Sequence, residues 1–334
     1  MNEITQGVVA TAPSTPSAIG TSGLNIQTLG FRRQMIPPPE NMVAVVLGKP
    51  NSGKTSFLAS CDEALIINLD GSSTPGVNQP RAMFWPGMNS EGELVIPDPA
   101  NPDDPDKGEA VTLTWELVKA MESYLHHLAK EGLPRPRMIA IDSIARAIDL
   151  AQDYVVRYAQ ELSIAREPVT HFNQLNGKAA WDVTYREVVD MIKRLKNSGY
   201  GVYLVVHLCD KTGNGTDGSM VTLTDQPSIT NSVQGRIWPM CEMIAKFSKR
   251  SSVKNVQVQA KDTKGNLLTT ADGKPKMVKR QQQSTDHVMS FTSGGAGDVT
   301  KTRRNLSEVV FDSDGTQFDQ FTTAYNASFS QENL

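Results

Sequence analysis

The sequence predicts an α/β fold, in which helices cover both faces of a mostly parallel β-sheet. Two observations predict it. Continuous apolar runs, which are typical of strands buried on both faces, alternate along the chain with stretches whose apolar residues have helical spacing. A glycine-rich segment also connects the first apolar run to a stretch that can be helical. We expect a core at residues 41–312, a mobile N-terminal tail at 1–40 and a C-terminal tail at 313–334.

The composition is that of an ordinary globular protein. Of the 334 residues, 39% are hydrophobic and 21% are charged. No run approaches the roughly 20 apolar residues that cross a bilayer, and no secretory signal is visible, so we expect no membrane contact. The cysteines, Cys61, Cys209 and Cys241, have neither metal-ligand nor disulfide spacing. They predict free thiols in a reducing cytoplasm.

The first segment and the apolar runs give the order of the predicted strands. Residues 1–40 are rich in Thr, Ser, Pro, Gly and Gln, so they cannot bury enough apolar surface to offset the entropy of ordering. Four apolar runs follow, and each predicts a buried strand, at residues 42–47, 64–69, 138–141 and 201–206.

Helices are predicted between these strands. Residues 115–130 have apolar side chains at the spacing of one helical face, and Gly132 and Pro134 end the stretch. We expect two further helices at residues 144–162 and 178–196.

The remaining segments have the composition of loops and hairpins. An insertion rich in Pro, Asp and Gly at residues 86–109 predicts a surface loop, and so does the polar, Gly-rich stretch at 212–232. Beyond it, apolar and polar residues alternate, and Asp272-Gly273 is a turn dipeptide, so residues 246–304 predict a β-rich part.

The glycine-rich segment matches the pattern G-x-x-x-x-G-K-[ST] at every position. Glycines let the backbone curl so that successive N–H groups point at phosphate oxygens, and the helix that follows directs its positive end at the same phosphates. The lysine reaches the β- and γ-phosphates and the threonine hydroxyl ligates Mg²⁺. The sequence therefore predicts a nucleotide phosphate loop made of Gly48, Lys49, Pro50, Asn51, Ser52, Gly53, Lys54 and Thr55.

An acidic residue is needed near such a loop to hold Mg²⁺ through water. Asp142 follows the apolar run at residues 138–141, where α/β sheets place their ligands. Its alternative role is to cap the helix that begins at Ile144. The two roles are compatible, and we favour metal coordination.

Two further polar residues follow buried strands. Hydrolysis needs a group that orients or deprotonates the attacking water, and Asp70 is the candidate; its alternative is a turn residue in Asp70-Gly71. His207 follows the fourth predicted strand, where it is either a group that senses the γ-phosphate or a structural side chain.

Charge is distributed unevenly along the chain. Lys246 to Arg304 contains 13 Lys and Arg against 4 Asp, a balance of +9, although the whole chain has a net charge of −3. Such asymmetry can mark a surface that faces a polyanion. The alternative is a solvated, Lys-rich β-hairpin region.

With these positions in order, the chain resembles the RecA-like P-loop ATPases. Within them it is most similar to the phage-encoded nucleotide-binding and single-strand-annealing recombinases with a minimal RecA core. The resemblance covers residues 41–312 and is carried by the phosphate loop, Ile66–Gly71, Ile139–Ser143 and Leu204–His207. In a RecA-type sheet, the strand that ends at Asp70 is expected to lie beside the phosphate loop.

The resemblance implies ATP hydrolysis with Mg²⁺, coupled to binding of single-stranded DNA in recombination or annealing. It also implies a homo-oligomer, assembled head to tail as a ring or filament, and cooperation with a single-strand-binding protein. A basic residue from the neighbouring subunit would complete the nucleotide site, and Arg303 and Arg304 are the candidates, although exposed loop charges are an equal alternative. The segment after His207 would contact DNA. A phage-encoded protein of this kind would act in the host cytoplasm.

Two departures from the family keep other functions open. RecA-type enzymes usually have Glu where this chain has Asp70, and the expected DNA loop has little positive charge and no aromatic ring for stacking on bases. One alternative is therefore a nucleotide-gated module that binds or anneals DNA with negligible turnover. Another is a P-loop motor such as a helicase or packaging ATPase.

Overall fold

The computed structural model describes residues 37–71, 81–98, 100–101, 104–214, 220–261, 267–291, 300–302, 306–311 and 315–331. The predicted N-terminal tail lies outside the described residues up to position 36. Residues 37–40 do not extend freely, because Pro39 is buried and its carbonyl oxygen accepts a hydrogen bond of 2.7 Å from the Tyr203 hydroxyl.

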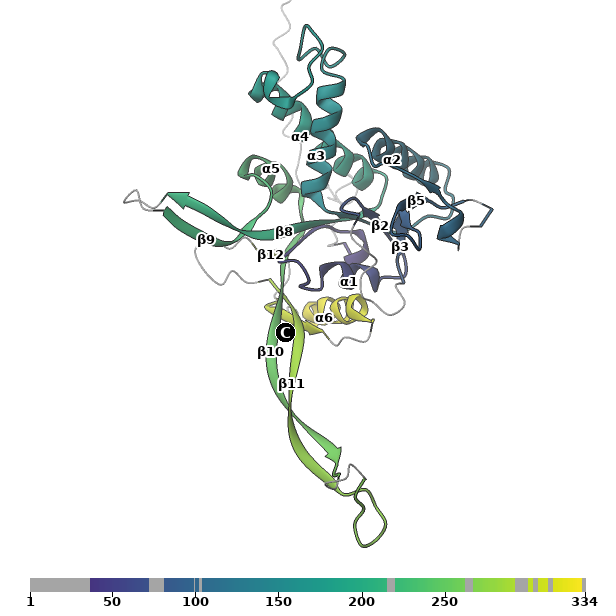
Figure 1. Ribbon diagram of the computed structural model, residues 1–334, viewed down its shortest axis with the longest axis vertical. Helices are drawn as coiled ribbons and strands as arrows, with labels where there is room; N and C mark the ends of the chain where they lie inside the picture. Colours follow the sequence, from purple (N-terminus) through teal and green to yellow (C-terminus); the bar gives the residue numbers. More distant parts are fainter. Residues whose placement is uncertain are drawn as a thin grey trace, which may run out of the picture. The chain divides into compact units, whose positions relative to one another are not determined.

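The core of the structure is a ten-stranded mixed sheet (Figure 1). Its strand order is β13-β11-β10-β1-β8-β7-β2-β3, with β9 paired to β8 and β12 paired to β10. The strands are β1 (Val43–Gly48), β2 (Ala64–Asn68), β3 (Met83–Trp85), β7 (Met138–Asp142), β8 (Gly201–Asn214), β9 (Met220–Pro227), β10 (Met243–Gln259), β11 (Met277–Ser290), β12 (Lys301–Thr302) and β13 (Glu308–Phe311).

The central strands are parallel, which confirms the predicted fold class. Strand β1 lies between β10 and β8, followed by β7, β2 and β3, and each of these neighbouring pairs is parallel. All four predicted strands are present. The sheet is that of a RecA-like P-loop fold, but the expectation that β2 lies beside the loop strand is wrong. Strands β7 and β8 separate β2 from β1, so Asp70 reaches the site across two intervening strands.

Helices cover both faces of this sheet (Figure 1). The helices α2 (Trp115–Lys130), α3 (Ile144–Arg157) and α4 (Gly177–Asn197) pack together against β7 and β8, while α1 (Lys54–Ala59) and α6 (Gln317–Gln331) pack on the opposite side; α5 (Asn231–Ile237) follows β9. The Thr114 and Ser143 side chains accept hydrogen bonds from first-turn amides of α2 and α3, which explains where these helices begin.

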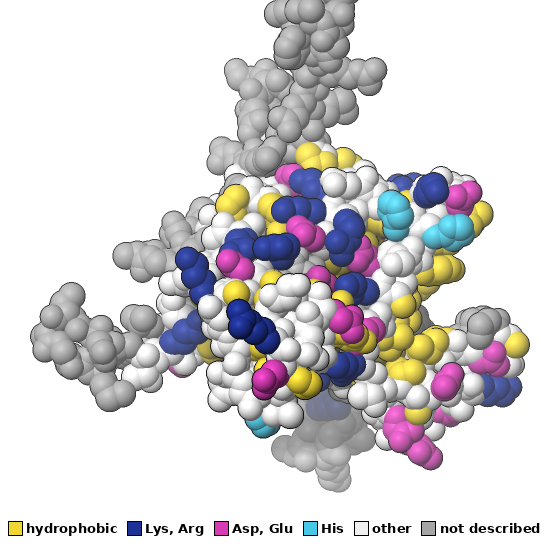
Figure 2. All heavy atoms as spheres, turned by 90° about the horizontal axis from the view of Figure 1, so that it is seen from above, with side chains coloured by type: hydrophobic (Ala, Val, Ile, Leu, Met, Phe, Trp, Pro, Cys, Tyr) yellow, Lys and Arg dark blue, Asp and Glu magenta, His cyan; other side chains and the backbone are white. Residues whose placement is uncertain are grey.

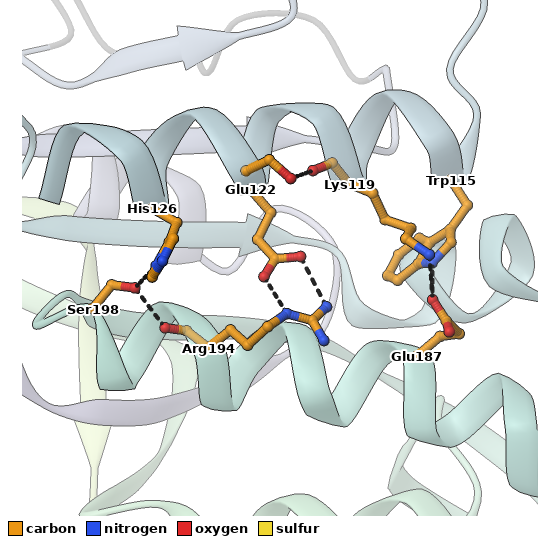
Figure 3. Close-up of polar contacts among 8 residues, drawn as sticks. Trp115, Lys119, Glu122, His126, Glu187, Arg194 and Ser198 are labelled. Carbon is orange, nitrogen blue, oxygen red and sulfur yellow. Dashed lines mark hydrogen bonds and ion pairs between the residues drawn. The ribbon is translucent and has the colours of Figure 1, made fainter. Parts of the chain in front are cut away.

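Polar contacts fix α2 against α4 (Figure 3). Glu122 is buried, and its carboxylate accepts hydrogen bonds from Arg194 Nε and NH2 at 2.5 and 2.9 Å. Trp115 Nε1 and Lys119 Nζ both donate to Glu187, at 3.1 and 3.2 Å. The forked guanidinium satisfies both oxygens of the buried carboxylate, so this charge is compensated within the helical layer.

Three segments that were predicted as loops or a longer helix have other structures. The helix expected at residues 144–162 ends at Arg157, and Ala159 beyond it is buried. The insertion at 86–109 contains β4 (Gly87–Met88), β5 (Leu94–Ile96) and β6 (Glu109–Ala110), which form a small sheet with Val95 buried. The stretch at 212–232 is mostly the end of β8, β9 and the start of α5, so the described part is a β-hairpin rather than a loop.

The expected C-terminal tail contains a helix. Phe318, Phe321 and Tyr325 of α6 are buried, and they share one helical face. Phe318 and Phe321 lie against Phe57 of α1, with ring centroids 5.3 and 5.7 Å apart. Burial of these rings explains why a mostly polar segment folds onto the core.

The remaining elements are short. They are the 3₁₀ turns Pro39–Asn41, Pro105–Lys107, Phe172–Gln174 and Trp238–Met240. Among the described residues, no helix combines the length and apolar character that a membrane span requires. Cys61 and Cys241 are buried and Cys209 is half-buried, all as free thiols, as predicted.

Candidate nucleotide-binding site

The predicted phosphate loop connects the end of β1 to the start of α1. A Cβ atom on Gly48 would lie 2.9 Å from the backbone carbonyl oxygen of Phe247 and 2.4 Å from Ser52 Oγ, so glycine is needed for the close approach of the loop to β10 here. Gly53 has φ +100° and Asn51 has φ 61°, backbone conformations that glycine adopts freely and asparagine tolerates. Helix α1 then begins at Lys54. The curled loop is therefore a property of these residue types.

Lys54 is buried inside the curl of the loop. Only 3% of the residue is exposed, and Nζ donates to the carbonyl oxygens of Gly48 at 2.8 Å and Lys49 at 2.9 Å. Burial lowers the pKa of Lys54 to about 8, although the carboxylates of Asp142 and Asp70 act to raise it. A bound anion would stabilise the charged form of this side chain.

Asp142 lies next to the threonine of the loop. Its Oδ2 accepts a hydrogen bond of 2.8 Å from Thr55 Oγ1, and burial raises the pKa of the Asp142 carboxyl above its usual range. The capping alternative for Asp142 is wrong, because Ser143 is the residue whose side chain accepts from the Arg146 amide of α3. A hydroxyl and a buried carboxylate form an oxygen donor set that suits a divalent cation such as Mg²⁺.

Asp70 and His207 meet beside Asp142. Asp70 Oδ1 accepts from the Ser143 hydroxyl at 2.9 Å, and Asp70 Oδ2 lies 3.2 Å from His207 Nε2. Burial acts to raise the pKa of Asp70, but hydrogen bonds from His207 and Ser143 lower it more, so its net shift is downward. Ligand atoms of Asp70, Asp142 and His207 all lie within 4.8 Å of one another. The structure thus brings three of the predicted site residues together.

His207 does not end its strand as predicted. It pairs with Gly48 at the carboxyl end of the parallel strand β1. Strand β8 then continues and forms a hairpin with β9. His207 therefore marks the point where the strand leaves the sheet beside the phosphate loop.

Acidic residues of the β8–β9 hairpin hold the second residue of the loop. Lys49 Nζ lies 3.1 Å from Asp225 and 3.6 Å from Asp210, and Lys246 of β10 lies 3.0 Å from Asp225. These contacts border a pocket of about 320 Å³, lined by Lys49, Pro50, Asn51, Ser52, Leu208, Asp225, Lys246, Phe247, Ser248 and Lys249. Sequence reasoning missed both acids, because nothing local distinguishes them from other surface carboxylates.

A histidine of β11 contacts the loop from the other side. His287 Nδ1 lies 2.9 Å from the Ser52 carbonyl oxygen, and a Cβ on Gly53 would lie 2.6 Å from the same nitrogen. Because a carbonyl oxygen can only accept, Nδ1 carries the proton in this bond. His287 is 235 residues away from Ser52 in sequence, so no local pattern predicted the contact.

Other predicted features remain untested. Arg303 and Arg304 lie outside the described residues, as do residues 215–219 of the expected DNA loop. Their roles stay predictions.

Comparisons with known proteins identify the family. The family model described as an AAA domain matches residues 40–274. No curated protein sequence matches the chain. Among solved structures, the flagellar accessory protein FlaH from Methanocaldococcus jannaschii is similar with a TM-score of 0.34 and 10% identity, over 82% of this chain and 86% of that one. The family match spans more than half of the chain, phosphate loop included, so the chain belongs to the AAA domain family.

Proposed function

We propose that this protein binds and hydrolyses ATP at the loop of residues 48–55 and acts on single-stranded DNA in recombination or strand annealing. The observation that carries the ATPase part is the cluster of Asp70, Asp142 and His207 within 4.8 Å, next to the Thr55 hydroxyl. A phosphate loop alone would support binding only. Carboxylates at the loop add a means to hold a cation and to orient water.

The residues of the loop have separate roles in this proposal. The backbone N–H groups of the loop bind the phosphates, and Lys54, already inside the loop, neutralises phosphate charge. Thr55 and Asp142 would hold Mg²⁺, directly and through water. When bound, Mg²⁺ would neutralise charge that develops on the phosphates.

Asp70 would orient the attacking water. Its two oxygens already accept from Ser143 and His207, and each carboxylate oxygen can accept a second hydrogen bond, so the group retains acceptor capacity for water. The lowered pKa of Asp70 keeps it ionised at neutral pH. His207, held by Asp70, would sense the γ-phosphate from the edge of the sheet.

Charge supports the DNA part. The stretch from Lys246 to Arg304 has a balance of +9, and the resemblance to RecA-like ATPases implies a DNA contact for the segment after His207, which enters the β8–β9 hairpin. The proposed assembly is a ring or filament in which Arg303 or Arg304 of a neighbouring copy reaches the nucleotide.

ATP turnover tests this function directly. Turnover is measured with and without single-stranded DNA for the wild type, Lys54→Ala and Asp70→Ala. We expect single-stranded DNA to stimulate the wild type, and both variants to lose at least 100-fold in kcat, which is the usual scale for removing a positioned catalytic group. Wild-type turnover that ignores DNA contradicts the DNA-dependent part and leaves the ATPase part intact.

A nucleotide-gated annealing module is the second candidate. The short side chain at position 70 favours it, because Asp70 stands where RecA-type enzymes usually have Glu and is one methylene shorter. Annealing that survives in Asp70→Ala, with ATP still bound, would support this function over one that requires turnover.

A further inference from the structure

The two long strands β10 and β11 leave the sheet as a two-stranded ribbon (Figure 1). We define the basic arm as residues 249–287. Ten cross-strand pairs, from Arg250↔Asp286 to Gln259↔Met277, extend it by about 30 Å. The neighbouring strands stop at its base, because the pairing of β13 with β11 ends at His287 and that of β1 with β10 ends at Phe247. Among the described residues, no third strand accompanies the arm.

The arm carries an excess of positive charge. It contains 9 Lys and Arg against 3 Asp and no Phe, Tyr or Trp. Arg250 is paired with Glu308, at 2.7 Å. Six further cations are exposed, and no described acidic side chain lies within salt-bridge distance of them; they are Lys249, Lys261, Lys274, Lys276, Lys279 and Arg280.

The helical layer differs from the arm. Seen from that end, Lys and Arg side chains are interspersed with Asp and Glu (Figure 2). Arg194 is paired with Glu122 and Lys193 with Asp190. Residues 115–197 contain 12 Lys and Arg against 11 Asp and Glu, whereas the arm has 9 Lys and Arg against 3 Asp, so the excess of positive charge lies on the arm.

Unpaired lysines on a bare ribbon have two physical explanations. Charged side chains on exposed strand edges prevent pairing with other chains. A few charged side chains of either sign are enough for this protection. It does not explain why the arm has nine cations and only three acids. A row of mostly positive side chains, with amide and hydroxyl side chains between them, can bind the negatively charged phosphate backbone of a nucleic acid. Since the arm has no Phe, Tyr or Trp and its one imidazole, His287, contacts the phosphate loop, it would contact phosphates rather than stack on bases.

The base of the arm contacts the phosphate loop. His287 donates to the Ser52 carbonyl oxygen over 2.9 Å and lies where a Cβ on Gly53 would be. A change in the position of the arm therefore changes the surroundings of two loop residues. If nucleic acid on the arm changes the affinity for nucleotide through this contact, nucleotide in the loop changes the affinity for nucleic acid by the same factor.

We propose that the basic arm binds the phosphate backbone of nucleic acid and that His287 links its occupancy to the phosphate loop. This inference rests on the proposed function and adds the surface that contacts DNA and the residue that connects it to ATP. His287 is a positioning residue in this arrangement.

Nucleic-acid binding by the full chain tests the surface. Fluorescence anisotropy with labelled single-stranded and duplex DNA of equal length is measured across a salt series. The arm variant carries Lys276→Gln, Lys279→Gln and Arg280→Gln. The matched control carries Lys130→Gln, Lys178→Gln and Arg186→Gln, which remove the same charge from exposed positions of the helical layer. We expect the arm variant to lose at least tenfold in affinity and about 2 in the slope of log K against log salt, and the control to keep the slope.

The outcomes separate this inference from the proposed function. If the wild type binds no nucleic acid, the DNA part of the proposed function fails. If the wild type binds DNA and the arm variant binds with equal affinity and slope, the arm is overturned while DNA binding stands. A change of oligomeric state in the arm variant, with DNA affinity unchanged, overturns it in favour of contact with a second copy. Equal loss for single-stranded and duplex DNA supports backbone contact shared by both.

A second measurement tests the link. The affinity for a fluorescent ATP analogue is measured with and without saturating single-stranded DNA, in wild type, His287→Ala and His287→Gln. We expect DNA to change wild-type nucleotide affinity by at least fivefold, the usual range for coupled sites. His287→Ala should bring this factor close to one when DNA is kept at a concentration that saturates that variant, and His287→Gln, whose amide can still donate to Ser52, should restore part of it. A coupling factor unchanged in His287→Ala overturns the link.

Discussion

Two hairpins leave the sheet beside the phosphate loop, and they are held in different ways. The β8–β9 hairpin contacts the loop through ion pairs of Asp210 and Asp225 with Lys49. The β10–β11 hairpin has a base packed in an aromatic cluster, where Phe247 lies 5.2 Å from Phe57 by ring centroids. Partly exposed ion pairs contribute little to stability, whereas a buried ring contributes several kcal/mol. The contact of the first hairpin with the loop can therefore break at small cost, whereas the base of the second is held by buried rings.

The largest expected effect tests the base of the β10–β11 hairpin. Phe247→Ala should lower the free energy of unfolding by about 3–5 kcal/mol, because it removes a ring that is 2% exposed. Urea unfolding measures it. The control is Val253→Ala on the same strand, which is 65% exposed and should change stability by about 0.5 kcal/mol or less. Equal costs for the two variants would mean that the base is not anchored by packing.

A substitution in the loop tests the contact between the loop and the β10–β11 hairpin. Gly53→Ala forces φ +100° on a residue with a Cβ and places that atom 2.6 Å from His287 Nδ1. We expect nucleotide affinity to fall at least tenfold, as a backbone strain of roughly 1–3 kcal/mol would give. Gly132→Ala, at φ +65° with open space around it, is strained without meeting a neighbour and should keep nucleotide affinity. Adding His287→Ala to Gly53→Ala should restore part of the loss; no recovery would show that the contact is irrelevant.

The pH dependence of nucleotide binding tests the buried charge of Lys54 in the phosphate loop, which both hairpins contact. The pKa of Lys54 is lowered to about 8, so the free protein loses this proton as pH rises through 8, and phosphate binds the charged form. ATP affinity should therefore be constant below about pH 8 and fall above it, by up to tenfold per pH unit. Isothermal titration at pH 7 to 9.5 measures the fall, with uptake of one proton per nucleotide at the upper end. In Lys54→Arg the fall should disappear, because the guanidinium stays charged.

The smallest expected effect is on the β8–β9 hairpin. Asp225→Asn keeps a side chain that tolerates its φ of 57° but removes the charge that holds Lys246. Stability should change by less than about 1 kcal/mol. Hydrogen exchange of β9 amides should become faster while that of the β10–β11 base stays unchanged. Faster exchange in both hairpins would show that they move as one unit.

Local patterns explain how much could be predicted. The four central strands and the phosphate loop are encoded within short segments, so apolar runs and a fixed motif were enough to find them. Asp142 and Asp70 follow from their positions after strands. The strand order does not follow from sequence position. The placement of β2 beside the loop was taken from the resemblance, and the structure corrects it.

The rest depends on contacts between distant segments. Asp225 and His287 reach the loop only after the β8–β9 and β10–β11 hairpins have formed. No sequence pattern near either residue indicates this contact. The helix α6 had a signal, since Phe318, Phe321 and Tyr325 recur at helical spacing, but its polar composition outweighed this pattern. Its burial depends on Phe57, more than 250 residues earlier.

The aromatic cluster around Phe57 also has a consequence for protein synthesis. The helix that carries Lys54 and Thr55 is six residues long, and its buried ring is covered by Phe247, Phe311, Phe318 and Phe321. During translation the first part of the ATP site leaves the ribosome long before the rings that pack beneath it. A nascent chain that stops before residue 317 lacks Phe318 and Phe321, so part of the Phe57 ring stays uncovered, and ATP-binding competence should arise only after α6 has been synthesised.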